Sequence, residues 1–403
     1  MIVSMINTVD YGSTGKIMLQ LKTVAESKNY SVATFSRRWI FKAKKKNNHH
    51  FFGFAIENLF HRLLSPLFGC ESLMSFWGTL SLCKQLKKNG TELIHLHNIH
   101  GHYLCFPILF RFIKKNHIPI IWTLHDCWSF TGRCPHFLMT KCDKWISGCN
   151  DCPYPRNFYP QAYIDTSRMM WKLKRKSFIG IEKCILTTPS QWLANLVKKS
   201  FLKDYPVNVI HNGIDLSVFK PTESLFREIY GLVHKKILLG VAFGWGKRKG
   251  IDVFVELSKR LPNEYKVVLV GTSDRVDALL PKNILSIHRT QSQKELAEIY
   301  SAADVFVNPT REDNYPTVNM EALACGTPVV TFKTGGSPEI LDESCGSVVD
   351  CDDVDAMELE IRRICEKKVF FKNACLKRAK LFDMNNRFEE YVDLYRKYKK
   401  NDT

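Results

Sequence analysis

The sequence predicts an α/β protein with two Rossmann-like domains, whose parallel sheets face one another across a cleft. The chain has 403 residues, enough for two domains. Short apolar runs alternate with longer stretches of helical periodicity, which is typical of βαβ units. Polar or glycine-containing turns follow many of these runs in both halves of the chain. Because ligands of open parallel sheets bind beyond the carboxyl ends of the strands, these turns predict a ligand cleft between the domains.

The apolar runs give the expected strands and domain boundaries. In the first half we expect strands at residues 2–7, 93–97, 119–124 and 184–189. In the second half we expect them at residues 207–211, 236–242, 266–270, 284–288, 304–308 and 328–332. A basic helical segment gives way to a new strand near residue 205, which predicts domains at residues 1–204 and 205–385. Apolar residues at near-helical spacing predict a terminal helix within residues 386–403.

Composition and termini favour a cytoplasmic globular protein. Hydrophobic residues make up 45% of the chain and charged residues 24%, as in ordinary soluble domains. No apolar run approaches the roughly 18–20 residues of a membrane-spanning helix. The first residues have neither the basic nor the apolar region of a secretory signal.

The formal net charge of +18 points to an anionic partner. Its densest part is residues 37–50 (RRWIFKAKKKNNHH), where aromatic residues interrupt the basic ones. Such a segment suits an anionic membrane surface, because each basic residue near the surface contributes about 1 kcal/mol of attraction. One hypothesis is therefore peripheral attachment to the inner face of the cell membrane. A solvated loop is the alternative. Nucleic acid is disfavoured, because no recognised binding motif accompanies the charge.

The segment at residues 303–341 carries the strongest chemical signal. We expect a helix from Pro316 that contains Glu321, and a second helix with Ser337 as its N-cap. Two helix N-termini at one edge of a sheet form an anion site, since their N–H groups are unpaired. Asp313, in the loop before the first helix, and Glu321 are carboxylates suited to accept hydrogen bonds from sugar and ribose hydroxyls.

This segment resembles the E-x7-E region of the retaining glycosyltransferases of family 4, which have the GT-B fold. In that family the first acidic residue contacts the transferred sugar and the second holds the ribose of the nucleotide. These roles fall on Asp313 and Glu321, with Asn314 beside them in the donor site. The first position is Asp rather than Glu, and the neighbouring Glu312 could take its place.

The sequence FGWGKRKGIDVF resembles the segment of this family that binds the donor diphosphate through a Lys-Gly pair. The pair falls on Lys249 and Gly250. Many members have an arginine five residues earlier, where this chain has Gly244. The resemblance therefore assigns the second positive charge to Arg248 or Lys247.

Other segments extend the resemblance over nearly the whole chain. They include TPSQWL at residues 188–193, VIHNGID at residues 209–215, and HLHNIHGHY at residues 95–103, which is similar to a subset that builds bacterial surface polysaccharides. His125 stands at a strand end in TLHDCW, where family members contact donor or acceptor, which favours a catalytic role. The alternative is a hydrogen-bonded structural histidine. The resemblance also implies that the terminal helix packs back toward the N-terminal domain.

The loop YGSTGKI is not a phosphate-binding P-loop, because Ile17 stands where Ser or Thr would bind Mg²⁺. Its glycines instead suit a loop whose backbone approaches a ligand. The resemblance supports a donor-binding role for Gly12, Ser13 and Gly15.

Cys134, Cys142, Cys149 and Cys152 form a cluster that includes a CxxC pair. Four thiolates can hold a structural zinc ion, although these spacings are not those of a common zinc finger. Free buried thiols are the alternative. Four thiolate ligands would leave no open position, so such a zinc ion would not be catalytic.

The resemblance implies transfer of a glycosyl group from a nucleotide-sugar donor to a glycan or lipid-linked acceptor. It implies retention at the anomeric carbon and no cofactor for catalysis. Two alternatives remain: a GT-B enzyme that isomerises or hydrolyses a sugar nucleotide, and a non-catalytic basic scaffold that binds nucleic acid.

Overall fold

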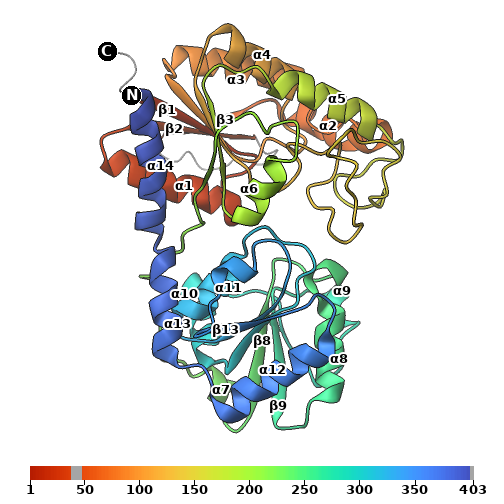
Figure 1. Cartoon of the computed structure of the whole chain (residues 1–403), viewed down its shortest axis with the longest axis vertical. Coiled ribbons are helices and arrows are strands. Elements are labelled where there is room, and N and C mark those ends of the chain that lie inside the picture. The colour runs from red at the N-terminus through yellow and green to blue at the C-terminus, as the bar shows by residue number, and fades with distance from the viewer. Residues whose placement is uncertain (38–47, 400–403) are drawn as a thin grey trace. The chain divides into compact units, whose positions relative to one another are not determined.

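The computed structural model describes residues 1–37 and 48–399. The chain divides into two compact units, the first made of Met1–His211 with Arg387–Thr403 and the second of Asn212–Asn386. Each unit has one parallel β-sheet with helices around it, which confirms the predicted fold class (Figure 1).

The first unit contains a seven-stranded sheet in the order β3-β2-β1-β4-β5-β6-β7. Its strands are β1 (Ile2–Ile6), β2 (Ser31–Arg37), β3 (His49–Phe52), β4 (Leu93–Leu96), β5 (Ile120–Thr123), β6 (Cys184–Thr188) and β7 (Val207–Val209). Its helices are α1 (Gly12–Ser27), α2 (Ala55–Phe68), α3 (Phe76–Lys88), α4 (Phe106–Lys115), α5 (Ser167–Phe178) and α6 (Gln191–Val197).

Strand β7 corrects the predicted domain boundary. We expected this strand to open the second domain, but it pairs with β6 in the first sheet, with Val207 opposite Leu186. The division therefore falls after His211 rather than after residue 204. Strands β2 and β3 extend the sheet beyond β1 and were not predicted.

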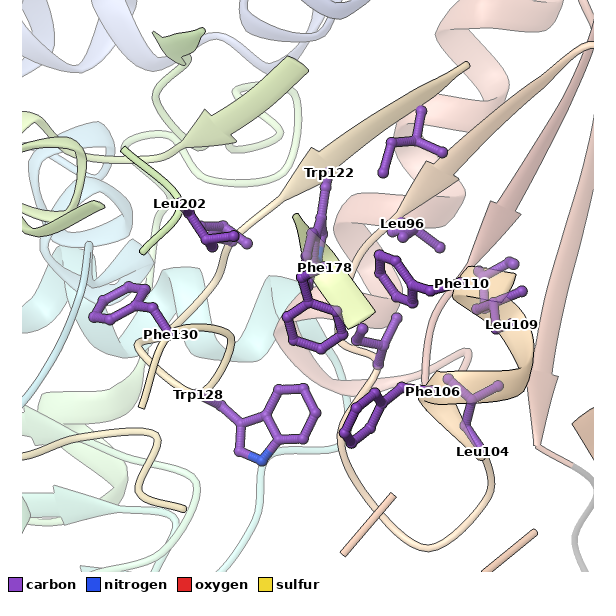
Figure 2. Packing of buried hydrophobic residues seen from close by; sticks show 14 of the residues in the cluster. Leu96, Leu104, Phe106, Leu109, Phe110, Trp122, Trp128, Phe130, Phe178 and Leu202 are labelled. Carbon is purple, nitrogen blue, oxygen red and sulfur yellow. The ribbon is translucent and has the colours of Figure 1, made fainter. Parts of the chain in front are cut away.

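The core of the first unit is rich in aromatic side chains. The rings of Phe110 and Phe178 lie 4.6 Å apart between centroids, and those of Trp122 and Phe178 lie 4.9 Å apart. Figure 2 shows these side chains gathered between the strands and the helices that cover them, with Phe106 beside them. Burial of each such side chain contributes about 1.5–3 kcal/mol, which anchors α4 and α5 on the sheet.

The terminal helix α14 (Met384–Lys399) packs on the first unit. The Tyr395 hydroxyl lies 2.7 Å from Nδ1 of His95 on β4, and the Tyr391 hydroxyl lies 3.4 Å from Oγ1 of Thr123 on β5. All four side chains are buried. The helix is thus part of the first unit's core, as the resemblance implied.

The second unit contains a six-stranded sheet in the order β10-β9-β8-β11-β12-β13. Alternate residues of β8 and β9 belong to two separate apolar clusters, so both faces of the sheet are covered. Its strands are β8 (Lys236–Val241), β9 (Tyr265–Val270), β10 (Leu285–Ile287), β11 (Val305–Asn308), β12 (Val329–Phe332) and β13 (Gly346–Val349). Its helices are α7 (Phe226–Ile229), α8 (Ile251–Arg260), α9 (Asp274–Asp277), α10 (Gln293–Ala302), α11 (Thr317–Ala324), α12 (Val354–Lys367) and α13 (Lys372–Ala379), with 3₁₀ turns η1 (Lys247–Lys249), η2 (Pro338–Ile340) and η3 (Lys380–Phe382).

Among the residues that the structure describes, none of the helices is both long and apolar enough to cross a bilayer.

Candidate active site

In the second unit, the loops that follow β8 and β11 meet at the carboxyl edge of the sheet. Nζ of Lys249 lies 2.5 Å from Oδ2 of Asp313, and both side chains are about four-fifths buried, with exposed fractions of 21% and 22%. Nη1 of Arg248 donates to the carbonyl of Glu312 at 3.1 Å. The structure therefore brings Arg248 to Glu312 and Lys249 to Asp313, and each of these two pairs is 64 residues apart in sequence.

Two glycines allow these loops to approach one another. Gly250 has φ +73°, and a Cβ there would stand 2.3 Å from the carbonyl oxygen of Pro309. Gly335, in the loop after β12, has φ +55°, and a Cβ there would stand 1.8 Å from the carbonyl oxygen of Asp313. Neither position accepts a side chain, so the loops after β8, β11 and β12 form one rigid edge.

Helix α8 begins directly after Gly250, which places Lys249 at a helix N-terminus. The first N–H groups of a helix lack partners within it and carry the positive end of its dipole. A lysine and an arginine beside such an end make a site for a phosphate group.

Part of the predicted anion site is wrong. Ser337 precedes only the single 3₁₀ turn η2, and its side chain makes no capping bond. Its hydroxyl instead accepts from Nδ2 of Asn319 at 3.0 Å and lies 2.7 Å from Oγ1 of Thr331, in a buried network. Pro316 occupies the N-cap position of α11 rather than its first turn. The helix N-termini at this edge are thus those of α8 and α11.

Glu321 lies on α11 and is oriented by the tyrosine beside it. Its Oε2 accepts a hydrogen bond from the hydroxyl of Tyr300, on α10, at 3.0 Å. Burial, together with the charge of Glu321, raises the pKa of Tyr300 well above its ordinary value, so the phenol remains a donor. The two predicted carboxylates, Asp313 and Glu321, are each fixed by a partner on another element.

In the first unit, Gly12 and Ser13 begin α1 directly after the loop that follows β1. Gly12 has φ +68° and open space where a Cβ would stand. At Gly15 a Cβ would stand 2.6 Å from the carbonyl carbon of Asp10. Gly15 is therefore required by the packing of the loop on itself, whereas Gly12 leaves room for a ligand.

His125 belongs to a row of imidazoles at the ends of β4 and β5. Its Nε2 lies 3.1 Å from Nδ1 of His97, and His97 stacks on His95 with ring centroids 4.4 Å apart. Burial lowers the pKa of His125 to about 4, although the charge of Asp126 opposes that shift. His125 is thus a neutral donor and acceptor at neutral pH, not a cation.

His100 and Asp126 form a largely buried ion pair beside this row, with Nε2 2.8 Å from Oδ2 and with 14% and 13% of the two side chains exposed. Burial alone would lower the pKa of His100, but the charge and hydrogen bond of Asp126 raise it. Burial would likewise raise the pKa of Asp126, yet His100 holds it at about 2. Both residues line a small pocket of about 10 Å³, together with His97 and His125.

The sequence singled out only His125 of this pocket. His97, His100 and Asp126 stood in the quoted segments HLHNIHGHY and TLHDCW, but no role was assigned to them. Their position just after β4 and β5 was the available signal, because side chains there share one edge of the sheet.

The four clustered cysteines lie in the long loop after β5. Burial raises the pKa of Cys134, and the thiols of Cys152 and Cys149 are near enough to raise it further. All fourteen cysteines are free of disulfides. Within the described residues, however, no three His, Cys, Asp or Glu side chains are arranged to hold a metal ion, so the zinc prediction gains no geometric support.

A buried lysine fixes the same loop. Nζ of Lys174, on α5, donates to the carbonyls of Trp128 at 2.7 Å and Thr131 at 3.0 Å. Burial lowers its pKa to about 7. These hydrogen bonds order the start of the loop.

The basic segment at residues 37–50 lies mostly outside the described residues, which omit 38–47. Of its ends, Arg37 closes β2 and His49 belongs to β3. His49 bonds Thr34 at 2.8 Å and Ser36 at 2.9 Å, which gives it a structural role. The membrane hypothesis for this segment stays a prediction.

Comparison with known proteins agrees with the geometry. Residues 30–218 match the model Glycosyltransferase Family 4, and residues 235–367 match Glycosyl transferases group 1. The chain is similar to the putative colanic acid biosynthesis glycosyl transferase WcaC of Escherichia coli (strain K12), with 27% identity over 66% of this chain. The matched region spans 65% of that relative's length.

Solved structures show the same fold. Sucrose-phosphate synthase from Thermosynechococcus elongatus superposes with a TM-score of 0.75 at 18% identity, over 98% of both chains. The Anabaena protein HepE in complex with UDP-glucose superposes with a TM-score of 0.66 at 13% identity, over 97% of this chain and 99% of that one. The two family models, together with the two parallel-sheet units, show that this chain belongs to the glycosyltransferases with the GT-B fold.

Proposed function

We propose that the protein transfers a sugar from a nucleotide-sugar donor to a glycan acceptor in surface polysaccharide synthesis. The observation that carries this proposal is the Lys249–Asp313 pair at the start of α8. It combines a cation for a diphosphate with a carboxylate for a sugar hydroxyl at one edge of the sheet.

The donor diphosphate binds at the N-terminus of α8 and takes over the ammonium of Lys249, with Arg248 as the second charge. This exchange releases Asp313, which then accepts a hydrogen bond from the transferred sugar, next to Asn314. Glu321 accepts hydrogen bonds from the ribose hydroxyls. As the bond to the diphosphate breaks, the cations and the helix end stabilise the charge that develops on the leaving group.

Transfer proceeds with retention and without a metal ion, and Asp313 and Glu321 act as binding residues rather than as the carboxylate pair of a glycosidase. The first unit binds the acceptor, a lipid-linked glycan, near His125, and its loop with Gly12, Ser13 and Gly15 contributes to donor binding. The neutral imidazole of His125 suits a hydrogen bond to a hydroxyl. The UDP-glucose bound by HepE supports a UDP-sugar as the donor, and the assignment of WcaC to colanic acid biosynthesis supports a polysaccharide product.

The test is thermal unfolding of the wild type and of Glu321→Ala with UDP-, GDP-, dTDP- and CMP-sugars. A ligand at about 100 times its Kd adds about 2.7 kcal/mol of stability. We expect one nucleotide class to stabilise the wild type, and Glu321→Ala to respond far less. Glu343→Ala removes an exposed carboxylate of the same unit and should respond like the wild type.

If no nucleotide sugar shifts the unfolding of the wild type, the proposal is wrong. If a nucleotide sugar does stabilise the wild type, analysis of the reaction products identifies the reaction. Release of free sugar without any acceptor product would indicate a hydrolase, and inversion at the anomeric carbon would contradict retention.

A further inference from the structure

Helix α2 presents its polar side chains to the protein and its apolar ones to solvent. Ile56 is 70% exposed and Leu63 is 60% exposed, whereas His61 and Ser65 are buried. Amphipathic helices of globular proteins normally have the opposite orientation, with the apolar stripe against the core. An exposed apolar face of this kind marks a binding surface.

Hydrogen bonds of the polar face fix this orientation. The two carboxylate oxygens of Glu57 accept from the backbone N–H groups of Trp77 and Gly78, each at 2.8 Å, at the start of α3. Nδ1 of His61 lies 2.8 Å from the hydroxyl of Ser75. Rotation of α2 to bury its apolar face would break all of these hydrogen bonds, so the face stays outward.

Helix α3 continues the same surface. Trp77 is 70% exposed, and Leu80, one turn further, is also exposed. Lys84 and Lys88 follow at helical spacing and are exposed as well. One face of α3 is therefore apolar over its first half and basic over its second. In Figure 1, α2 lies on the side of the first unit away from α14.

The exposed charged side chains of α2 and α3 have one sign. Glu57 is the only acidic residue of α2 and α3, and its carboxylate is occupied. Arg62 is exposed on α2, and Lys84, Lys87 and Lys88 are exposed on α3. A symmetric contact with a second copy would bring these cations together without a carboxylate between them, and like charges oppose such an interface.

We infer that the exposed face of α2 and the first half of α3 bind an anionic lipid bilayer. Exposed Phe, Leu and Ile side chains enter the boundary between headgroups and acyl chains, Trp77 lies at the level of the headgroups, and the lysines of α3 contact lipid phosphates. This surface goes beyond the proposed transfer reaction and is built from residues outside the donor site.

The test is sedimentation of the full chain with vesicles of phosphatidylcholine and phosphatidylglycerol, and with vesicles of phosphatidylcholine alone. We expect binding to the anionic vesicles and at least about a tenfold loss of it in Phe60→Gln/Leu63→Gln, which removes two exposed apolar side chains. The control is Leu225→Gln/Ile229→Gln, which changes two equally exposed apolar residues of the second unit and should bind like the wild type.

A second variant, Lys84→Gln/Lys87→Gln/Lys88→Gln, should weaken binding to the anionic vesicles and reduce its salt dependence, with Arg62 left as the remaining cation of this surface. Vesicle binding that is absent in the wild type, or unchanged in Phe60→Gln/Leu63→Gln, would overturn the inference. So would a dimer in solution that this apolar variant dissociates while vesicle binding persists. Nucleotide-sugar stabilisation, measured on the same variants, should equal that of the wild type; its loss in every protein would instead count against the proposed function.

Discussion

Replacing Asp126 with asparagine measures how much the buried ion pair contributes to the pocket of the first unit. Asp126 bonds His100 at 2.8 Å and accepts from the backbone N–H of Trp128 at 2.8 Å, with 13% of its side chain exposed. Asparagine has the same size and retains an acceptor for Trp128. It removes the charge opposite a protonated imidazole, and a buried charge without its partner is costly.

The pKa values give the magnitude. Although burial opposes the shift, His100 lowers the pKa of Asp126 from 3.8 to about 2. At about 1.4 kcal/mol per pH unit, this shift corresponds to about 2 kcal/mol of stability.

The pKa values also give the sign of the pH dependence. The stabilisation from Asp126 is present above its unfolded pKa of 3.8 and is lost as the pH falls through about 2. The pKa of His100 is raised, so its stabilisation is present below the unfolded pKa of 6.5 and is lost as the pH rises through the folded value. The difference between wild type and Asp126→Asn is therefore largest between pH 3.8 and 6.5.

Urea unfolding followed by tryptophan fluorescence measures this difference. All but one of the eight tryptophans precede residue 212, so the signal reports on the first unit. We expect a loss of about 2 kcal/mol at about pH 5 and a smaller loss at about pH 9. Asp204→Asn removes an exposed carboxylate of the same unit and serves as the control. Equal losses at both pH values, or a loss at about pH 5 no larger than that of the control, would refute the assignment of an ion pair.

Three further changes test other parts of the structure. Lys249→Met should lower kcat/KM by about 10- to 100-fold through loss of a charge-assisted contact, whereas Lys259→Met, at the far end of α8, should leave it unchanged; equal effects would contradict the role of Lys249. Gly335→Ala should lower the melting temperature and weaken donor binding, because its methyl group would stand 1.8 Å from the carbonyl oxygen of Asp313; a wild-type melting curve would argue against that close approach. Phe178→Ala should cost about 3–5 kcal/mol in urea unfolding, and a loss below about 1 kcal/mol would be inconsistent with the packing in Figure 2.

The strands that could be predicted are those whose sequence is a continuous apolar run that ends in a polar turn. Strands β8 and β11 are continuous apolar runs followed by polar turns, and both were predicted. Strand β2 contains Ser and Thr at positions that the sheet buries, and β13 begins with Gly346 and Ser347, so neither forms a continuous apolar run and neither was predicted. Strand β7 was predicted but assigned to the wrong sheet, because strand pairing depends on contacts distant in sequence.

For the candidate site, too, single residues could be predicted from the sequence, whereas the contacts between them could not. The resemblance supplied Asp313, Glu321 and Lys249 as separate residues, but the contact between Lys249 and Asp313 needed the fold. The His100–Asp126 pair joins two loops: the position of each partner just after a strand can be recognised in the sequence, but the contact between them cannot. Periodicity can show that α2 is amphipathic, but only the contacts of Glu57 show which face meets the protein.

The position of α14 constrains the order in which the chain can complete its fold during synthesis. His95 and Thr123, in the middle of the first sheet, bond to tyrosines that leave the ribosome only after the whole second unit. A nascent chain of which only residues 1–211 have emerged from the ribosome therefore exposes the apolar and polar surface that α14 later covers. N-terminal domains commonly fold before the rest of a chain is made. Here the first unit cannot complete its native packing until α14 is made, and the surface that α14 covers stays exposed throughout translation of the second unit.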